Sequence, residues 1–223
     1  MNVAVIGAAG GLGQGILAEC RAMGIQFTAI VRSRPERIND VPSGSRVVVV
    51  TSLADRAALA AAFTGVDAVI TALGITATSQ DQSATLSANM DTVERAMHDA
   101  GVDRIVVINS LLTQRPGEPA GKLMRFFSLM PGIVGRGARE LRAVSDALGR
   151  GAFSSLRWTL VRGGLNSRGR DDVPAVSADW AGASNSWMPL SYRAMGRWML
   201  DEAAANRYVR KAPLVSRRRG RMV

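Results

Sequence analysis

The chain has 223 residues, and the 47% that are hydrophobic are enough to bury the core of one α/β domain. Its single cysteine, Cys20, excludes an internal disulfide, and no apolar run reaches the roughly 20 residues that a membrane span needs. Met1 leads straight into apolar sequence, without the basic region or cleavage site of an export signal. We therefore expect one domain in the cytoplasm, without a membrane partner.

The formal charge is +10, and most of it lies in one stretch near the end of the chain. Residues 206–223 hold seven basic residues and no acidic one, whereas the rest of the chain holds 21 basic against 18 acidic residues. A charge run of this kind is usually a solvated tail. We expect a domain over 1–205 and a basic tail over 206–223. A nucleic-acid partner is disfavoured, because no nucleic-acid-binding module accompanies the charge.

Short β-branched runs alternate with longer helical stretches, which is the pattern of a parallel sheet covered by helices on both faces. The sequence predicts an α/β fold, a Rossmann-type doubly wound sheet of about six or seven strands in the order 3-2-1-4-5-6. Strands are expected over 2–6, 26–31, 46–50, 67–72, 104–109 and 157–162. Helices are expected over 11–23, 55–63, 82–100 and 137–149.

Two stretches, 111–136 and 164–188, break this rhythm, and each follows the carboxyl end of a predicted strand. Ligands bind at that edge of an open α/β sheet, so we expect both stretches to line a substrate site. The second stretch carries Trp180 and Trp187. The first contains an apolar segment that could form a helical lid or, equally, a core or subunit contact; its apolar residues are Leu123, Met124, Phe126, Phe127, Leu129 and Met130.

The first predicted strand runs into a glycine-rich turn that opens directly into a helix. Gly7 allows a tight exit from the strand, Gly10 lets a pyrophosphate approach the backbone, and Gly13 allows the helix to pack closely on the sheet. The free amides at the start of the helix would then bind the phosphates. This pattern, placed between a strand and a helix, predicts a dinucleotide-binding site.

The second predicted strand ends where an NAD-specific site usually offers an acidic residue to the ribose hydroxyls. This chain has no acid there. Arg32 and Arg34 could instead clasp a 2′-phosphate, and Ser33 could hydrogen-bond to it. The sequence therefore favours NADP(H) over NAD(H) as the cofactor.

With these residues in place, the chain resembles the atypical short-chain dehydrogenase/reductases, and among them the NmrA-like and NADPH-dependent flavin reductase or biliverdin-reductase-like group. The resemblance covers roughly residues 2–202. The segments that carry it are GAAGGLG (7–13), VRSR (31–34), GVDAVITALG (65–74), ANMDTVERAMHDAGVDRIVVINS (88–110), LRWTLVRGG (156–164) and PLSYRAMGRWMLDEA (189–203).

The resemblance implies a dinucleotide that lies across the carboxyl edge of the sheet. Gly10, Gly11 and Leu12 would contact its pyrophosphate, and Arg32 its adenosine phosphate. The other implied cofactor contacts are Ser52 and Leu53 on the adenine side, Ala72, Leu73 and Gly74 along the ribose, Ser110 and Leu111 near the nicotinamide, and Arg162, Gly163 and Gly164 over its ring.

Typical members of this superfamily use a Tyr and, four residues later, a Lys to exchange a proton with the substrate oxygen. Aligned on Asp146, the corresponding residues here are Ala138 and Arg142. Ala138 cannot exchange a proton, and Arg142 stays charged. The remaining candidate is Ser110, at the end of the fifth predicted strand, whose hydroxyl could orient an acceptor. Arg142 is a secondary catalytic candidate.

Flavins and quinones can accept hydride without a tyrosine acid, because their nascent anions are delocalised and water can supply the proton. The leading hypothesis is therefore an NADPH-dependent reductase of a flavin, quinone or other conjugated carbonyl-like acceptor, a small planar or apolar substrate. Flavin-reductase-like relatives often carry a His where this chain has Leu165. One alternative is a non-catalytic NADP(H)-sensing NmrA-like regulator, and another is a pathway-specific ketoreductase or isomerase on the same fold.

The composition also argues against a metal ion. No metal site is expected, because His98 and Cys20 are the sole residues of their types. His98 lies in a predicted helix, where a surface or half-buried position is expected. The sequence leaves the oligomeric state open, a homodimer included.

Overall fold

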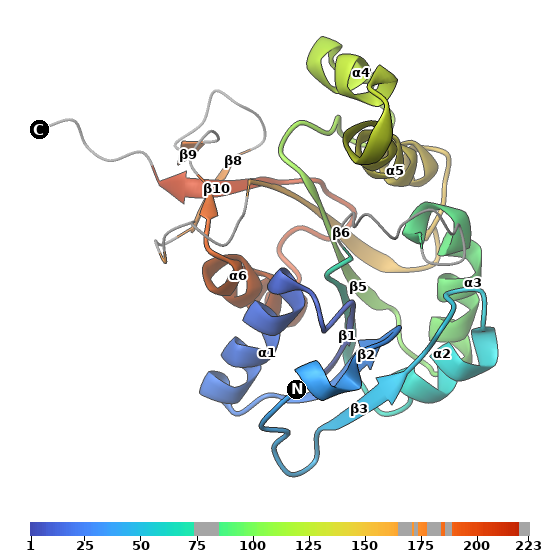
Figure 1. Ribbon diagram of the computed structural model, residues 1–223, viewed down its shortest axis with the longest axis vertical. Helices are drawn as coiled ribbons and strands as arrows, with labels where there is room; N and C mark the ends of the chain where they lie inside the picture. The colour runs from blue at the N-terminus through green and yellow to red at the C-terminus, as the bar shows by residue number, and fades with distance from the viewer. Residues whose placement is uncertain (74–84, 165–170, 172–173, 178–183, 186–188, 219–223) are drawn as a thin grey trace, which may run out of the picture.

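The computed structural model describes residues 1–73, 85–164, 171, 174–177, 184–185 and 189–218. Within them lies one twisted sheet with helices on both faces (Figure 1). The strand order begins β3-β2-β1-β4-β5-β6, as the sequence predicts, and continues with β10. The described strands are β1 (Asn2–Ile6), β2 (Gln26–Val31), β3 (Arg46–Val49), β4 (Ala68–Thr71), β5 (Arg104–Ser110), β6 (Arg157–Gly163), β8 (Pro174–Ser177), β9 (Ser184–Asn185) and β10 (Leu214–Arg218).

Every pairing from β3 across to β10 is parallel, whereas β8 and β9 pair antiparallel with β10. Successive residues of a strand point to opposite faces of the sheet. In β1, Val3 and Val5 enter the core on one face, and Ala4 and Ile6 enter the core on the other. All four are buried, which explains why the strands read as continuous apolar runs.

The helices form two layers, with α1 and α6 on one face and α2, α3 and α5 on the other (Figure 1). α4 packs against α5 at the periphery of the molecule. No helix in the described part of the chain combines the length and the apolar character needed to cross a bilayer. The described helices are α1 (Gly11–Met23), the 3-10 turn η1 (Pro35–Arg37), α2 (Arg56–Phe63), α3 (Leu86–Asp99), α4 (Lys122–Leu129), α5 (Gly132–Gly149) and α6 (Tyr192–Ala205).

The boundaries of two helices differ from the sequence prediction. α3 begins at Leu86, four residues after the predicted start, because Thr85 is still extended, with φ −95° and ψ 141°. α5 begins at Gly132, five residues before the predicted start, and follows directly on Pro131, its N-cap. Proline cannot donate a backbone hydrogen bond, so this is a position where a helix readily starts. The apolar segment before it forms the separate helix α4.

The predicted tail over 206–223 is wrong for residues 206–218. Asn206 ends α6 in the left-handed conformation, with φ 55°, and the chain then returns to the sheet as β10 beside β6. Leu214 and Val215 are completely buried in that strand. The basic residues obscured a short apolar segment from Ala212 onward, which supplies the seventh parallel strand among the described residues.

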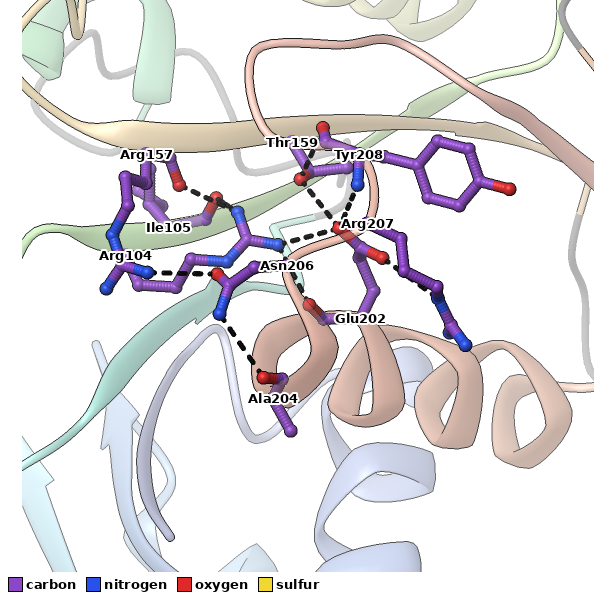
Figure 2. A network of polar contacts seen from close by, with 9 residues as sticks. All are labelled: Arg104, Ile105, Arg157, Thr159, Glu202, Ala204, Asn206, Arg207 and Tyr208. Atoms are coloured by element: carbon purple, nitrogen blue, oxygen red, sulfur yellow. Dashed lines mark hydrogen bonds and ion pairs between the residues drawn. The ribbon is translucent and has the colours of Figure 1, made fainter.

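A buried ion pair between Arg104 of β5 and Glu202 of α6 joins the sheet to α6 (Figure 2). The two side chains are 1% and 0% exposed, and an Arg104 Nη donates to the Glu202 carboxylate over 3.0 Å. The Tyr208 amide donates to the same carboxylate oxygen over 2.8 Å. Burial lowers the pKa of the Arg104 guanidinium, and the charge of Glu202 opposes that effect. The network fixes the end of α6 and the loop that leads to β10.

Candidate functional site

The glycine turn joins β1 to α1 more closely than side chains would allow. Gly7 adopts φ +85°, and its amide donates to the Ile30 carbonyl of β2 over 3.0 Å. A Cβ on Gly13 would lie 2.4 Å from the Gly7 carbonyl oxygen and 2.6 Å from the Ala8 Cα. The first turn of α1 therefore rests directly on the backbone of the turn, as the glycine pattern predicts.

The start of α1 presents backbone amides without a side-chain cap. Gly10 is the N-cap, in an extended conformation, and the first turn contains no acidic residue. The first helical hydrogen bond runs from the Gln14 amide to the Gly10 carbonyl over 2.8 Å, so the amides of Gly11, Leu12 and Gly13 have no acceptor within the helix. Such a helix end attracts anions, and these three amides are suited to bind a diphosphate.

A guanidinium that is not among the residues predicted from the sequence lies beside this turn. Arg34 is left-handed, with φ 61°, and Pro35 then starts η1, which brings the chain back toward α1. Arg37, the last residue of η1, has a guanidinium nitrogen 3.5 Å from the Ala9 carbonyl oxygen, and its own carbonyl accepts from the Gln14 side chain over 2.9 Å. The signal that could have identified it is the proline directly after Arg34.

The residues predicted to face the adenosine half lie after the ends of β2 and β3. Arg32, Ser33 and Arg34 are all exposed. The Ser52 hydroxyl accepts from the Ala54 amide over 3.1 Å. The Leu53 side chain is buried in the core, so only the Leu53 backbone is left to face an adenine.

A cavity of about 400 Å³ opens between the end of β5 and the helices α4 and α5. Its volume falls within the range of small-molecule sites. Ser110 contributes the one polar side chain among the described lining residues. Of the six apolar residues predicted in this region, Met124 and Phe127 line the cavity, whereas Leu123, Phe126 and Leu129 face outward. The lining residues are Ser110, Leu112, Met124, Phe127, Ile133, Val134, Gly137, Ala138 and Leu141.

Ser110 is held at the cavity by its neighbour Asn109, a positioning residue that is not among those predicted from the sequence. The buried Asn109 side chain donates to the Leu141 carbonyl of α5 over 3.0 Å and accepts from the Ser110 amide over 2.7 Å. The Ser110 hydroxyl oxygen accepts from the Leu112 amide over 3.2 Å. Because the oxygen is the acceptor in that bond, its own hydrogen is left to donate to a bound molecule.

The two residues that stand in place of the usual Tyr and Lys differ in their position relative to the cavity. Ala138 lines the cavity. Arg142, one turn further along α5, forms an ion pair with Asp146 over 3.4 Å, and Asp146 also accepts from the Gln114 side chain over 2.8 Å. Arg142 is not among the described residues that line the cavity, so it and Ser110 do not meet there.

The remaining predicted contacts follow the same edge of the sheet. The Ala72 amide donates to the Ile6 carbonyl over 2.8 Å, and half-buried Leu73 follows it; the Leu111 amide donates to the Gly163 carbonyl over 3.2 Å. Predicted residues that fall outside the described ones are Gly74, Leu165, Trp180 and Trp187.

Arg162 was expected to close over the nicotinamide ring, but its side chain is directed elsewhere. It is 5% exposed and donates to the carbonyls of Ala212 (2.9 Å) and Thr113 (3.2 Å). Gly163 is packed so tightly that a Cβ would lie 2.4 Å from the Met195 methyl carbon, and the Gly164 carbonyl accepts from the Leu190 amide. The backbone of 162–164, rather than the Arg162 guanidinium, is therefore left to approach a ligand.

Two reactive side chains lie away from this edge. Burial raises the pKa of the Cys20 thiol to about 12, so it stays protonated and is a poor nucleophile. His98 is exposed on α3, as the sequence predicts, with Nε2 2.7 Å from the Ser155 hydroxyl oxygen.

Residues 7–179, which include the glycine turn and the cavity, match the family model of NAD(P)H-binding proteins. Among solved structures, a candidate exported protein of Burkholderia pseudomallei is 24% identical, with a TM-score of 0.67 over 97% of this chain and 99% of that one. A candidate NADH-flavin reductase of Streptococcus pneumoniae is 19% identical, with a TM-score of 0.71 over 98% and 100%. A candidate epimerase of Bacteroides thetaiotaomicron is 19% identical, with a TM-score of 0.75 over 98% of each chain.

No curated protein matches the chain significantly. Identities this low show that the fold is shared, but they do not show that this chain has the activities of those proteins. The family model extends over more than half of the chain and includes the glycine turn, where α1 begins without a side-chain cap. The chain belongs to the NAD(P)H-binding family.

Proposed function

We propose that the protein is an NADPH-dependent reductase that transfers hydride to a flavin, a quinone or another conjugated carbonyl-like acceptor. The observation that carries this proposal is the apolar cavity at the end of β5, which contains the Ser110 hydroxyl and has Ala138 where related dehydrogenases have a tyrosine. A candidate NADH-flavin reductase is among the proteins of similar fold.

The cofactor, when bound, supplies the hydride. The amides at the start of α1 bind its pyrophosphate, and the cations of 32–37 are suited to its 2′-phosphate. Only β4 lies between β1 and β5 in the sheet, so the glycine turn and Ser110 are two strand spacings, about 10 Å, apart along one edge. A dinucleotide can extend over that distance.

The cavity suits an acceptor that needs little help from acids. Its apolar lining suits the face of a planar ring, and the Ser110 hydroxyl can donate a hydrogen bond to the oxygen that gains negative charge. The charge is delocalised in a reduced flavin or quinone, and water supplies the proton. The reaction therefore does not require the proton exchange that Ala138 cannot perform.

Acceptor-dependent oxidation of NADPH is the direct test. With flavins, quinones and enones as acceptors, absorbance at about 340 nm should fall in the presence of the protein. Ser110→Ala should lower kcat by about 10- to 100-fold and change NADPH affinity by much less, because the hydroxyl acts mainly on the acceptor. Ala138→Phe should raise the KM for the acceptor by filling the cavity.

The matched control for this assay is Ser154→Ala, an exposed serine in the loop before β6. It should retain the activity of the native protein. Tight NADPH binding without any acceptor-dependent oxidation would contradict the proposal and support a cofactor sensor instead.

The preference for NADPH is tested at the cations beside the glycine turn. Arg32→Ala and Arg37→Ala should each reduce the ratio of NADPH to NADH affinity by about tenfold, since each removes one charge-assisted hydrogen bond to the 2′-phosphate. Arg150→Ala, at the exposed end of α5, is the control and should leave the ratio unchanged. Equal affinities of the native protein for both cofactors would refute the assignment.

A further inference from the structure

α4 and the first turn of α5 carry an exposed band of large apolar side chains. Among the residues that the structure describes, nine large hydrophobic residues are exposed, and five of them fall within 123–134. Phe126 is 60% exposed and Leu129 84%. α4 lies at the periphery of the molecule, outside α5 (Figure 1). We call these five residues the apolar band: Leu123, Phe126, Leu129, Ile133 and Val134.

Of the band, Ile133 and Val134 also line the cavity, whereas the three residues on α4 are not needed to pack that helix onto the protein. Met124 and Ser128, four residues apart, are buried on the inner side of the helix, and Arg139 of α5 donates to the Ser128 carbonyl over 2.7 Å. Phe126 and Leu129, three residues apart, project on the outer side, where a helix in water normally carries polar residues. The outer side is therefore suited to a second apolar environment.

Positive charge borders the band, and the segment that carries both contains no acidic residue. Lys122, Arg125 and Arg139 are exposed, and residues 119–139 include no Asp or Glu. The acids on either side are engaged elsewhere: Glu118 pairs with Arg115 over 2.6 Å, and Glu140 accepts from the Ser87 amide over 2.9 Å. An occupant of this surface must combine an apolar interior with negative charge at its border.

We propose that α4 and the start of α5 bind the surface of a membrane that contains anionic lipid. The apolar band would enter the boundary between headgroups and acyl chains, while the cations contact lipid phosphates. A second copy of this chain fits the surface less well, because a two-fold contact would place the cations of both copies together. The sequence predicts no membrane partner because no apolar run is long enough to span a bilayer, but binding to a membrane surface needs no such run.

The test measures co-sedimentation of the full chain with vesicles. Binding should be strong to vesicles of phosphatidylglycerol and phosphatidylcholine, weak to phosphatidylcholine alone, and reduced by salt. The double variant Phe126→Ser/Leu129→Ser should lower the bound fraction by about tenfold or more. Neither residue lines the cavity, so the reductase assay should be unaffected in solution, and failure of this proposal is distinguishable from failure of the proposed function.

Two matched controls distinguish binding through the band from binding caused by the overall hydrophobicity or charge of the chain. Met23→Ser/Val41→Ser removes two other exposed hydrophobic residues and should bind as the native protein does. Lys122→Glu/Arg125→Glu should abolish binding, whereas Arg95→Glu/Arg150→Glu, with the same change in net charge but on other elements, should have a small effect. Circular dichroism melting curves establish that each variant is folded.

Three outcomes would overturn the proposal. The first is no binding of the folded protein to the anionic vesicles. The second is equal weakening by both charge-reversal pairs, which would assign binding to the overall charge. The third is a dimer in analytical ultracentrifugation that dissociates in Phe126→Ser/Leu129→Ser, which would make the band a contact between copies of this chain.

Discussion

Glu202→Ala is expected to lower the free energy of unfolding by about 3–5 kcal/mol, measured by urea denaturation. The Glu202 carboxylate is completely buried, and one of its oxygens accepts from Arg104 (3.0 Å) and from the Tyr208 amide (2.8 Å) (Figure 2). Removing it leaves the Arg104 guanidinium, which is 1% exposed, as an uncompensated charge in the core. The cost of that buried charge, rather than the strength of the ion pair itself, sets the size of the effect.

The neighbouring ion pair provides the control. Arg207 lies 3.6 Å from the other oxygen of Glu202 but is 54% exposed, so Arg207→Ala should cost less than about 1 kcal/mol. The double variant Arg104→Met/Glu202→Leu should recover most of the loss, because it removes both charges and retains apolar volume. If Glu202→Ala does not fold, Glu202→Gln, which retains one acceptor, should show a smaller loss. A Glu202→Ala protein as stable as the native one would show that the network does not hold α6.

The importance of α6 extends from stability to the candidate site. Its first residue, Tyr192, places its ring against Gly11, where a Cβ would lie 2.4 Å from a ring carbon. Further along α6, where it packs against α1, a Cβ on Gly196 would lie 3.0 Å from the Ile16 backbone. The ion pair at the end of α6 and the glycine contacts near its start together hold α1, and with it the glycine turn.

The parts of the fold that the sequence predicts are those with a strong local signal. The six predicted strands are apolar on both faces, and the glycine turn stands between a strand and a helix, so neither depends on distant parts of the chain. β10 has a weak local signal, because its apolar residues, Leu214 and Val215, stand among arginines. Its place is set by pairing with β6, a contact between segments about fifty residues apart.

In the candidate site too, some residues have a clear local signal in the sequence and others do not. Ser110 is identifiable because it ends a clear strand, and the structure places it in a cavity. Arg37 reaches the glycine turn only because Arg34 is left-handed, a conformation that the residue type does not predict. Asn109 positions Ser110 through a bond to Leu141, which is distant in sequence. Both contacts arise from the packing of elements, and the proline after Arg34 marks a turn without showing what the turn brings together.

Gly13→Ala is expected to weaken NADPH binding by about 10- to 100-fold, measured by isothermal titration calorimetry, because one or two charge-assisted hydrogen bonds are lost. The new Cβ would lie 2.4 Å from the Gly7 carbonyl oxygen, whereas ordinary contact begins near 3.4 Å, so α1 must move back by about 1 Å. That movement displaces the amides of Gly11 and Leu12 from the phosphates. Alanine favours a helix by about 1 kcal/mol over glycine, but it cannot relieve a backbone clash by rotating, so stability should also fall by about 1–3 kcal/mol.

The control for this substitution is Gly121→Ala, the N-cap of α4, where a Cβ has no heavy atom within 4 Å and φ is −61°. It introduces the same methyl group and should leave both NADPH affinity and stability unchanged. Gly10→Ala separates binding from packing, since its Cβ would lie 3.3 Å from the Gly7 oxygen and its backbone, at φ −79°, accepts alanine. It should fold stably and still bind NADPH less tightly if the phosphates approach Gly10. Native affinity in both Gly13→Ala and Gly10→Ala would place the cofactor away from this turn.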